Sequence, residues 1–190
     1  MSLGPIPALL LIDIQTGFND PIRPKRSTPS FETNITRLIS AFRGRGLPIF
    51  HVAHHSTDPK SPFHPINNPA GIKFQPYATP IEGEPTFCKN VNSAFIGTEL
   101  ESSIRTAGIQ QLFIAGMTTD HCVSTSTRMA ANLGVVGDTG KIFIIRDGTA
   151  AYAKGGFDAE TVHGVNLASL DEEFADVIST DEVIKCIELQ

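Results

Sequence analysis

Apolar runs of strand length alternate along the chain with segments whose apolar residues recur at helical spacing. Residues 8–13 form a nearly continuous apolar run, which indicates a buried strand, and the segment that begins at Ser30 has the period of an amphipathic helix until Gly44. Alternating strands and helices predict right-handed crossovers and a parallel sheet covered on both faces, so the fold class is α/β. The pattern leaves the order of the strands open. Strands are predicted over residues 8–13, 48–53, 85–89, 111–116, 141–147 and 175–179, and helices over 30–44, 97–107, 121–133, 158–169 and the end of the chain.

A long segment between the second and third predicted strands, residues 54–85, contains seven prolines and little periodicity. Irregular segments of that length are uncommon inside a compact domain and are usually functional, so a functional loop is predicted here rather than a linker. The chain shows no internal repeat, low-complexity tract or second domain boundary. With 190 residues, 41% of them hydrophobic, it is predicted to form a single domain over residues 1–190.

The net charge, the apolar runs and the cysteines argue against several classes of partner and site. The net charge of −5 argues against a nucleic-acid or anionic-membrane partner, and the basic residues Arg23, Lys25 and Arg26 are interpreted as a solvated loop. No apolar run approaches the roughly 18 residues of a membrane span, and the N-terminus lacks a secretory pattern, so a cytoplasmic location without a membrane partner is expected. Three cysteines without Cys-x-x-Cys spacing indicate neither a disulfide framework nor a zinc ribbon.

Three residues with complementary chemistry, Asp13, Lys89 and Cys122, stand at the ends of apolar runs. Because the carboxyl ends of strands in an open parallel sheet share one crevice, we expect their side chains to converge on one ligand site. A carboxylate within reach can take the proton of a thiol, and a nearby cation favours the reactive thiolate. The alternative for Cys122 is a small buried hydrophobic residue. Cys122 nevertheless lies at the start of a predicted helix, whose N-terminus is expected to lower the pKa of the thiol.

The segment IAGMTTDHCVSTSTRMAANLG, residues 114–134, resembles the isochorismatase-like cysteine hydrolase family, which contains nicotinamidases, carbamoyl-amine amidohydrolases and isochorismatases. LLLIDIQTGF (residues 9–18) and FCKNVNSAFIGTEL (residues 87–100) resemble two further blocks of the family, in the same order. The similarity runs from about residue 8 to about residue 180. It implies a doubly wound, Rossmann-like three-layer sandwich with a six-stranded parallel sheet.

The resemblance also implies roles for individual residues. Cys122 is the expected nucleophile, Asp13 the base toward the thiol and later the acid toward the leaving amine, and Lys89 the cation that holds the carboxylate. A cis peptide bond is expected at Met117–Thr118, with an oxyanion hole made by the backbone amides of Thr118 and Cys122. The implied reaction is hydrolysis of the C–N bond of a small amide, carbamoyl or ureido substrate through a thioester, without a cofactor.

Aromatic residues are expected to supply the apolar wall of a small pocket. Phe18 is the strongest candidate because it lies five residues beyond Asp13, and ordinary core or lid packing is the alternative for each aromatic residue. The long loop is expected to pack partly against another subunit, which together with the resemblance predicts a homo-oligomer, a dimer at least. The other aromatic candidates are Phe63, Phe74, Tyr77 and Phe95.

Histidines near the second strand bear on the question of a metal. Nicotinamidases of this family bind a divalent metal through an Asp-x-His motif after that strand, but residues 51–57 read HVAHHST and contain no such motif. Histidine clusters can bind zinc, yet loop or pocket histidines without metal are the preferred interpretation. The missing motif argues against nicotinamidase. The histidines concerned are His51, His54, His55 and His64.

Three further residues near the predicted site receive no assigned role. His163 is expected on a helix surface or at an interface. Asp120 and Arg128 flank Cys122, and two roles stay open for them: positioning the nucleophile or pairing across an interface.

Three other functions compete with that of an amidohydrolase. Isochorismatase, which cleaves a vinyl ether, is the runner-up, but family members with that activity commonly lack the cysteine, and no basic patch for a dicarboxylate is evident. A dinucleotide-binding oxidoreductase is disfavoured because LLLIDIQTGF replaces the Gly-x-Gly-x-x-Gly turn after the first strand. A binding protein without activity is disfavoured by the intact set of Asp13, Lys89 and Cys122.

Overall fold

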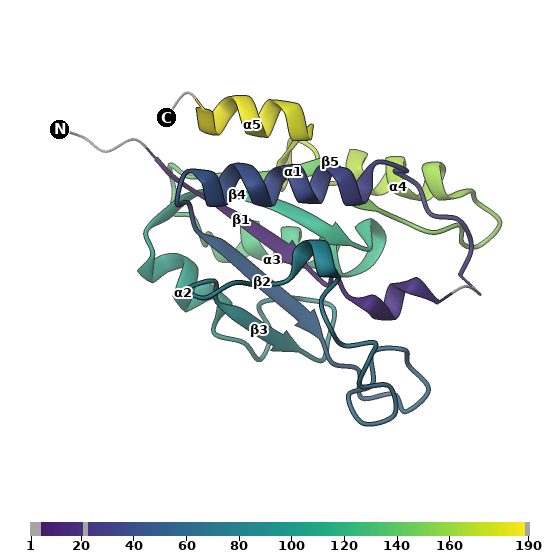
Figure 1. The fold of residues 1–190 in the computed structure, drawn as a ribbon. Coiled ribbons are helices and arrows are strands. Elements are labelled where there is room, and N and C mark those ends of the chain that lie inside the picture. The colour runs from purple at the N-terminus through teal and green to yellow at the C-terminus, as the bar shows by residue number, and fades with distance from the viewer. Residues whose placement is uncertain (1–4, 21–22, 189–190) are drawn as a thin grey trace.

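A computed structural model describes residues 5–20 and 23–188, which form one six-stranded sheet and five α-helices (Figure 1). The strands are β1 (Ile6–Ile12), β2 (Ile49–His54), β3 (Thr86–Lys89), β4 (Ile109–Met117), β5 (Lys141–Ala150) and β6 (Asp176–Ile178). They pair in parallel in the order β3-β2-β1-β4-β5-β6. The order reverses at β1 and β4, so the sheet is doubly wound, and ligands of such sheets bind at the carboxyl edge beside this reversal.

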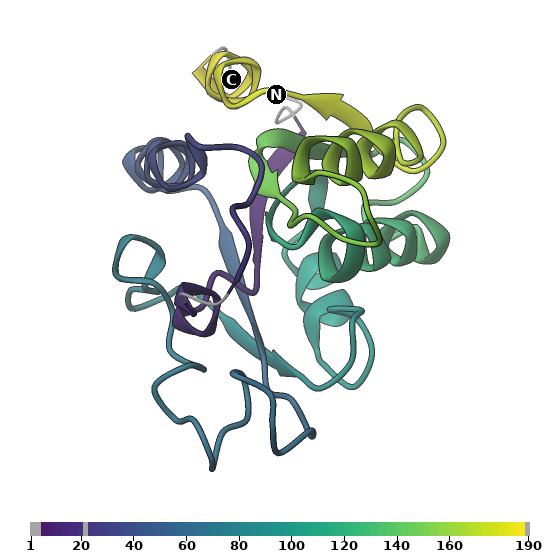
Figure 2. The ribbon, with the colours of Figure 1, turned by 90° about the vertical axis from the view of Figure 1, so that its right-hand side faces the viewer.

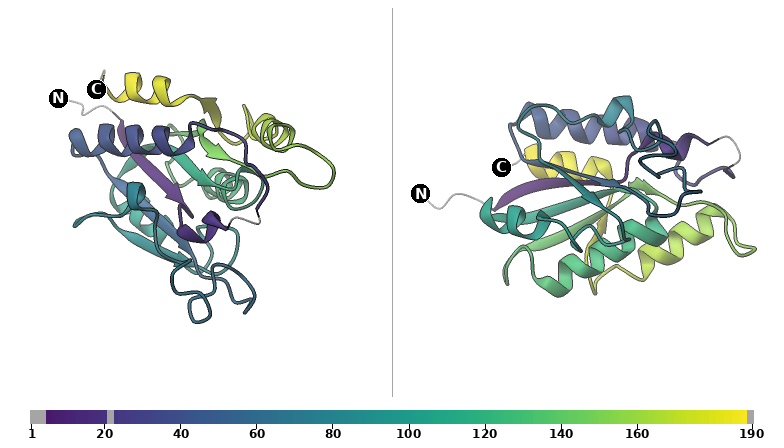
Figure 3. Two further views of the ribbon diagram at one scale, coloured as in Figure 1. Left: turned by 45° about the vertical axis from the view of Figure 1, so that its right-hand side comes forward. Right: turned by 90° about the horizontal axis from the view of Figure 1, so that it is seen from below.

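Helices cover both faces of the sheet and give three layers (Figures 2 and 3). The helices are α1 (Phe31–Gly44), α2 (Leu100–Thr106), α3 (Ser124–Leu133), α4 (Ala159–Ala168) and α5 (Thr180–Glu188). The α1 and α5 helices pack on one face, and α2, α3 and α4 pack on the other. The predicted α/β fold with a six-stranded parallel sheet is therefore confirmed.

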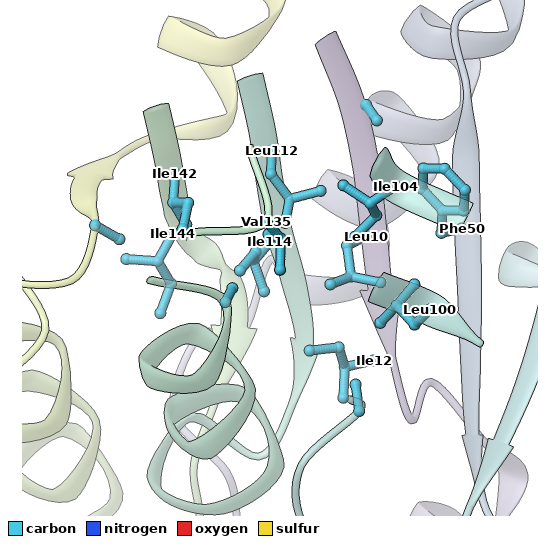
Figure 4. Packing of buried hydrophobic residues seen from close by; sticks show 14 of the residues in the cluster. Leu10, Ile12, Phe50, Leu100, Ile104, Leu112, Ile114, Val135, Ile142 and Ile144 are labelled. Carbon is cyan, nitrogen blue, oxygen red and sulfur yellow. The ribbon is translucent and has the colours of Figure 1, made fainter. Parts of the chain in front are cut away.

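The strand β1 is buried on both sides because its side chains alternate between two hydrophobic cores. Leu9 and Leu11 belong to the core under α1 and α5, whereas Leu10 and Ile12 belong to the core on the opposite face, shown in Figure 4. A central parallel strand requires such a continuous apolar run, since neither of its faces meets water. The run places β1 in the middle of the sheet, and the residue that follows it enters the crevice.

Two of the predicted helices differ from the observed ones. The segment predicted as a helix over residues 121–133 begins with a π-helical turn, η3 (Thr119–Val123), and becomes α-helical only at Ser124. Such wide turns occur frequently at functional sites. The helix predicted near residues 97–107 is the shorter α2. In residues 5–20 and 23–188, no helix combines the length and the apolar character needed to cross a membrane.

Residues 55–85 form the long irregular segment that the sequence predicts. Its one regular piece, within this fully described stretch, is the 3-10 helix η2 (Pro76–Ala78). Gln15 fixes the start of the loop: its side-chain amide accepts from the His54 amide at 2.8 Å and donates to the Ile72 carbonyl at 2.8 Å. The loop is thereby fixed next to the residues that follow β1 (Figure 1).

Glu84 fixes the other end of the loop to α1 and β2. Arg43 donates to its two carboxylate oxygens at 2.7 and 2.8 Å, and His51 Nε2 lies 2.8 Å from one of them. Burial raises the pKa of Glu84, but Arg43, the Ile81 amide and His51 outweigh it, so the pKa falls to about 2. Burial and the charge of Arg43 together lower the pKa of His51 by more than Glu84 raises it, so His51 is neutral at pH 7 and donates to the carboxylate.

The first prediction concerns acid stability. Glu84 has a folded pKa below its unfolded value, so it stabilises the fold above pH 4.5 and loses this contribution as the pH falls toward about 2. Glu84→Gln should therefore lower the free energy of unfolding at pH 7 by about 1–3 kcal/mol, and the difference from wild type should shrink in acid. Urea unfolding between pH 7 and pH 2 measures this, with the exposed Glu82→Gln as control. A difference that does not change with pH would contradict the assignment.

The second prediction concerns Gly116, where β4 lies against β1. Gly116 has a φ of 138°, and a Cβ placed on it would lie 2.1 Å from the Ile12 carbonyl oxygen. Gly134 ends α3 with a φ of 57° and has open space around its Cβ position. Gly134→Ala should cost about 1–2 kcal/mol for the left-handed backbone alone, whereas Gly116→Ala should cost about 1–3 kcal/mol more because of the overlap. Equal midpoints in urea for the two variants would contradict this.

Candidate active site

The three residues with complementary chemistry meet at the carboxyl edge of the sheet. Asp13 follows β1, Lys89 is the last residue of β3, and Cys122 lies in η3 after β4. Lys89 Nζ donates to Asp13 Oδ2 at 2.7 Å and lies 3.3 Å from Cys122 Sγ. β2 separates β1 from β3, and the long lysine side chain spans the end of β2, where Nζ also lies 3.2 Å from His54 Nδ1. The convergence expected from the strand ends is therefore present.

Local backbone structure directs two of these side chains inward. Asp13 has a φ of 53°, a left-handed conformation that aspartate tolerates better than most residues, and its amide still donates to the Val52 carbonyl at 2.9 Å. In the edge strand β3, Thr86 and Cys88 are exposed, whereas Lys89 at the end of the strand is buried. Asp13 thus keeps a strand-type backbone hydrogen bond while its side chain turns into the crevice. The edge strand β3 supplies the buried cation, Lys89.

Lys89 lies between Asp13 and Cys122, and each of the three groups affects the charge of the others. The side chains of Lys89 and Asp13 are 0% and 2% exposed, so each depends on the other for charge compensation. Burial raises the pKa of Asp13, and the charge and hydrogen bond of Lys89 offset part of this effect. Burial, followed by the negative charge of Asp13, raises the pKa of Cys122 to about 12, while Lys89 lowers it by less. The thiol is therefore protonated at neutral pH.

The lowered thiol pKa expected from the helix start is thus wrong for the ligand-free protein. That expectation counted the helix terminus and the cation, but the sequence did not show how deeply Cys122 is buried or how strongly Asp13 acts on it. Asp13 Oδ1 is buried and has no hydrogen-bond partner among the described residues. It is an available acceptor for the thiol proton, so the geometry favours forming the thiolate by internal transfer to Asp13 over loss of a proton to water.

The turn that carries Cys122 is tightly organised. The peptide bond between Met117 and Thr118 is cis, at the position that the resemblance implies. The Thr118 carbonyl accepts from the amides of His121 and Val123 at 3.1 and 3.2 Å. Thr118 and Cys122 both line the pocket described below.

His163 is buried, contrary to the expectation of a residue on a helix surface or at an interface. Its Nε2 lies 3.0 Å from the Arg146 carbonyl oxygen and its Nδ1 lies 2.8 Å from Thr119 Oγ1. A carbonyl only accepts, so Nε2 carries the proton and Nδ1 accepts from the threonine hydroxyl. Burial lowers the pKa of His163, which keeps the ring neutral. The histidine connects α4 to η3 and β5, a link that helical spacing alone does not show.

A pocket of ≈ 400 Å³ opens beside Asp13 and Cys122, a size typical of small-molecule sites. Phe18, the predicted wall residue, lines it together with Phe63 from the long loop and Tyr152, which follows β5. The Phe18 ring centroid lies 4.7 Å from that of Phe63 and 6.3 Å from that of Tyr152. An apolar wall thus faces the reactive side chains.

The remaining aromatic candidates pack elsewhere. Phe95 lies in the core under α2 and α3, Tyr77 packs against the core under α1, and Phe74 lies against the His51 ring. For these three, the alternative of core or lid packing is the observed one.

Arg23 also lines the pocket, so its interpretation as part of a solvated loop is wrong. Its guanidinium carbon lies 5.1 Å from the Phe18 ring centroid, 5.4 Å from that of Tyr152 and 5.9 Å from that of Phe63. These are cation–π contacts. These contacts could not be predicted from the sequence, because the three rings come from segments that are far apart in the chain. Lys25, by contrast, is exposed as expected.

Asp120 faces the pocket, whereas Arg128 does not line it. Asp120 pairs with Lys154, a pocket residue that no sequence pattern indicates, and Lys154 Nζ lies 2.7 Å from His121 Nε2. Burial raises the pKa of Asp120, but the hydrogen bond from Lys154 and further contacts outweigh it, so the pKa is lowered overall. Arg128 donates to Ser169 Oγ at 2.6 Å and so connects α3 to the end of α4.

The histidines considered as metal ligands make separate contacts. His54 accepts at Nδ1 from Lys89, and burial followed by the charge of Lys89 lowers its pKa to about 4. His51 pairs with Glu84, and His64 Nδ1 accepts from a backbone amide at 3.0 Å. Within the described part of the chain, no three or more His, Cys, Asp or Glu residues are grouped so as to hold a metal ion. This donor set does not fit the metal site of the nicotinamidases.

The fold and the site together define a small α/β protein with a buried set of Asp13, Lys89 and Cys122 beside a pocket. The chain matches the Isochorismatase domain over residues 7–182 and belongs to this family of hydrolases. It is 37% identical over 181 residues to the uncharacterized isochorismatase family protein YrdC of Bacillus subtilis, covering 93% of this chain and 94% of that protein.

Two further comparisons extend the similarity. The crystal structure of an isochorismatase-family hydrolase from Chromobacterium violaceum superposes with a TM-score of 0.89 and 35% identity, covering 97% of this chain and 95% of that one. N-carbamoylsarcosine amidase from Arthrobacter sp. is 28% identical over 210 residues, covering 97% of this chain and 72% of the amidase.

The third prediction tests the charge coupling in the site. In Asp13→Asn, the Cys122 thiol loses the negative charge that raises its pKa and keeps Lys89, so its pKa should fall below the wild-type value of about 12. The pH dependence of alkylation by iodoacetamide, followed by mass spectrometry of the Cys122 peptide, measures this. Asp138→Asn, which changes an exposed aspartate, is the control. An unchanged or higher thiol pKa in Asp13→Asn would show that Asp13 does not act on the thiol.

Proposed function

We propose that the protein hydrolyses the C–N bond of a small amide, carbamoyl or ureido compound through a thioester on Cys122. The observation that carries this proposal is the buried contact of Lys89 with both Asp13 and Cys122 beside a pocket of small-molecule size. Cleavage of an amide requires a strong nucleophile and a proton for the leaving nitrogen, and this trio supplies both. The similarity to N-carbamoylsarcosine amidase supports the same reaction class.

The first half-reaction forms the acyl-enzyme. Asp13 takes the thiol proton at its available oxygen, and Lys89 stabilises the thiolate that attacks the substrate carbonyl. The backbone amides of Thr118 and Cys122 hold the oxyanion, and one such donor typically lowers the barrier by about 3 kcal/mol. The C–N bond breaks as Asp13 gives the proton to the nitrogen, so ammonia or an amine leaves and Asp13 is again a carboxylate.

The second half-reaction is hydrolysis of the thioester. Asp13 accepts a proton from a water molecule whose oxygen attacks the thioester carbonyl, and the same oxyanion site holds the second intermediate. When the C–S bond breaks, Asp13 returns the proton to Cys122 and the acid is released. Lys89 stays charged throughout, so the trio has the same net charge before and after turnover.

Other family activities are supported less well. Cleavage of a vinyl ether forms no acyl-enzyme, so a thiol in contact with Lys89 and next to Asp13 favours an amidase over an isochorismatase. The second sequence argument against isochorismatase, the missing basic patch, does not hold, because Arg23 and Lys154 line the pocket. The missing Asp-x-His motif still argues against nicotinamidase.

The fourth prediction is the activity itself. Ammonia release is measured across amides, ureides and nicotinamide, and pyruvate release is measured from isochorismate. At least one amide or ureide should be hydrolysed, and Cys122→Ala should lower kcat by about 10⁴-fold or more, whereas Cys186→Ala on α5 should retain it. Intact mass after an acid quench should show an acyl adduct that maps to Cys122. Ammonia release that survives in Cys122→Ala, or turnover of isochorismate alone, would contradict the proposal.

A further inference from the structure

His54 lies where the side chain of Lys89 crosses the end of β2. It is the last residue of β2 and is in register with Lys89 at the end of β3. The ammonium of Lys89 reaches from β3 toward Asp13 after β1, and on the way its Nζ lies 3.2 Å from His54 Nδ1. His54 also lines the pocket beside Asp13 and Cys122. None of the proposed reaction steps involves this side chain.

The ammonium of Lys89 has three N–H donors, and three acceptors surround it. Its Nζ lies 2.7 Å from Asp13 Oδ2, 3.3 Å from Cys122 Sγ and 3.2 Å from His54 Nδ1. The Lys89 side chain is 0% exposed, so a donor that lost its acceptor would stay unsatisfied in a buried place, which is costly. His54 therefore completes the set of acceptors that a buried ammonium needs.

The His54 ring is a neutral acceptor. An ammonium only donates, so Nδ1 accepts and the proton of the neutral ring is on Nε2. Burial, followed by the charge of Lys89, lowers the pKa of His54 to about 4, so the ring carries no charge at pH 7. A neutral acceptor orients the ammonium without cancelling its charge. A carboxylate in the same place would instead add a negative charge that opposes the thiolate.

Contacts to the backbone and to the ring fix the direction in which His54 Nδ1 points. The buried side chain of Gln15 accepts from the His54 amide at 2.8 Å and donates to the His54 carbonyl at 3.2 Å, much as a neighbouring strand would. The Phe63 ring lies at 79° to the imidazole, with the two centroids 6.1 Å apart. The acceptor for Lys89 is thus held by the residues that follow β1 and by the long loop.

We propose that His54 is a positioning residue for Lys89: its neutral ring holds the ammonium so that it faces both Asp13 and Cys122. Without this acceptor the ammonium can turn toward Asp13 alone, which strengthens the resting ion pair and opposes transfer of the thiol proton. The inference rests on the proposed function, since it takes Cys122 as the nucleophile. It adds a fourth side chain, which acts through Lys89 and takes no part in bond formation.

The fifth prediction compares three replacements of His54 that have nearly the same shape. Leucine has no acceptor, asparagine has a neutral one near the place of Nδ1, and aspartate has an anionic one. Labelling of Cys122 by iodoacetamide is followed by mass spectrometry at a pH of about 8.5, where the rate follows the small thiolate fraction. His54→Leu and His54→Asp should label about 10-fold more slowly than wild type, which corresponds to one unit of thiol pKa, and His54→Asn should restore most of the rate.

Control measurements separate this role from folding and from access to the pocket. Cys186 on α5 is labelled in the same samples, and its rate should be the same in all variants. His55→Leu removes the neighbouring imidazole, which lies 3.8 Å from Cys88 Sγ, and should keep the wild-type rate at Cys122. Thermal unfolding of each variant checks the fold. If His54→Leu is unfolded at the assay temperature, the comparison of His54→Asn with His54→Asp tests the proposal.

The labelling needs no substrate, so the two proposals fail separately. Slow labelling in His54→Leu and His54→Asp, with recovery in His54→Asn, supports the role of His54 even if wild type releases no ammonia. The role is overturned if folded His54→Leu labels at the wild-type rate, if His54→Asn is as slow as His54→Leu, or if His54→Asp is as fast as His54→Asn. Each of these three results leaves the proposed hydrolysis standing.

Discussion

The buried contact of Lys89 with Asp13 and Cys122 is the interaction on which the site depends. A charged ammonium and a carboxylate taken out of water are tolerated only when they compensate each other closely, and removing one leaves the other uncompensated. Here the two are 2.7 Å apart and almost fully buried. This requires the end of β1 and the end of β3 to be held in register across β2, so the rigidity of the parallel sheet is a condition for the chemistry.

The same contact explains how a thiol with a raised pKa can act as a nucleophile. Cys122 does not release its proton readily, because burial and the charge of Asp13 both oppose the thiolate. Moving the proton to Asp13 removes that opposing charge and leaves Lys89 next to the new thiolate, so the net charge of the trio is unchanged. The transfer therefore exchanges one buried ion pair for another, and the proton stays available for the leaving nitrogen.

Features that depend on neighbours in sequence could be predicted, whereas features that depend on distant segments could not. The run at residues 8–13 predicts a buried strand, and its last residue is predicted as a site residue because an unpaired charge there would be costly to desolvate. The strand order is not a local property, and only the family resemblance implied it. Burial of Cys122 is also a tertiary property, which is why the direction of its pKa shift was predicted incorrectly. Arg23 and His163 were misjudged for the same reason, since their partners lie in other elements.

Charged side chains lie within the trio and also in the pocket wall outside it. The trio of Asp13, Lys89 and Cys122 is electrically neutral as a unit, so it offers little attraction to an anionic substrate. A carboxylate brought in without a partner would oppose formation of the thiolate: at about 8 Å and an effective dielectric constant of about 20, two like charges repel by about 2 kcal/mol. Arg23 and Lys154 line the pocket outside the trio. A charge that offsets this repulsion therefore has to come from that wall of the pocket, because the charge of Lys89 is already balanced by Asp13.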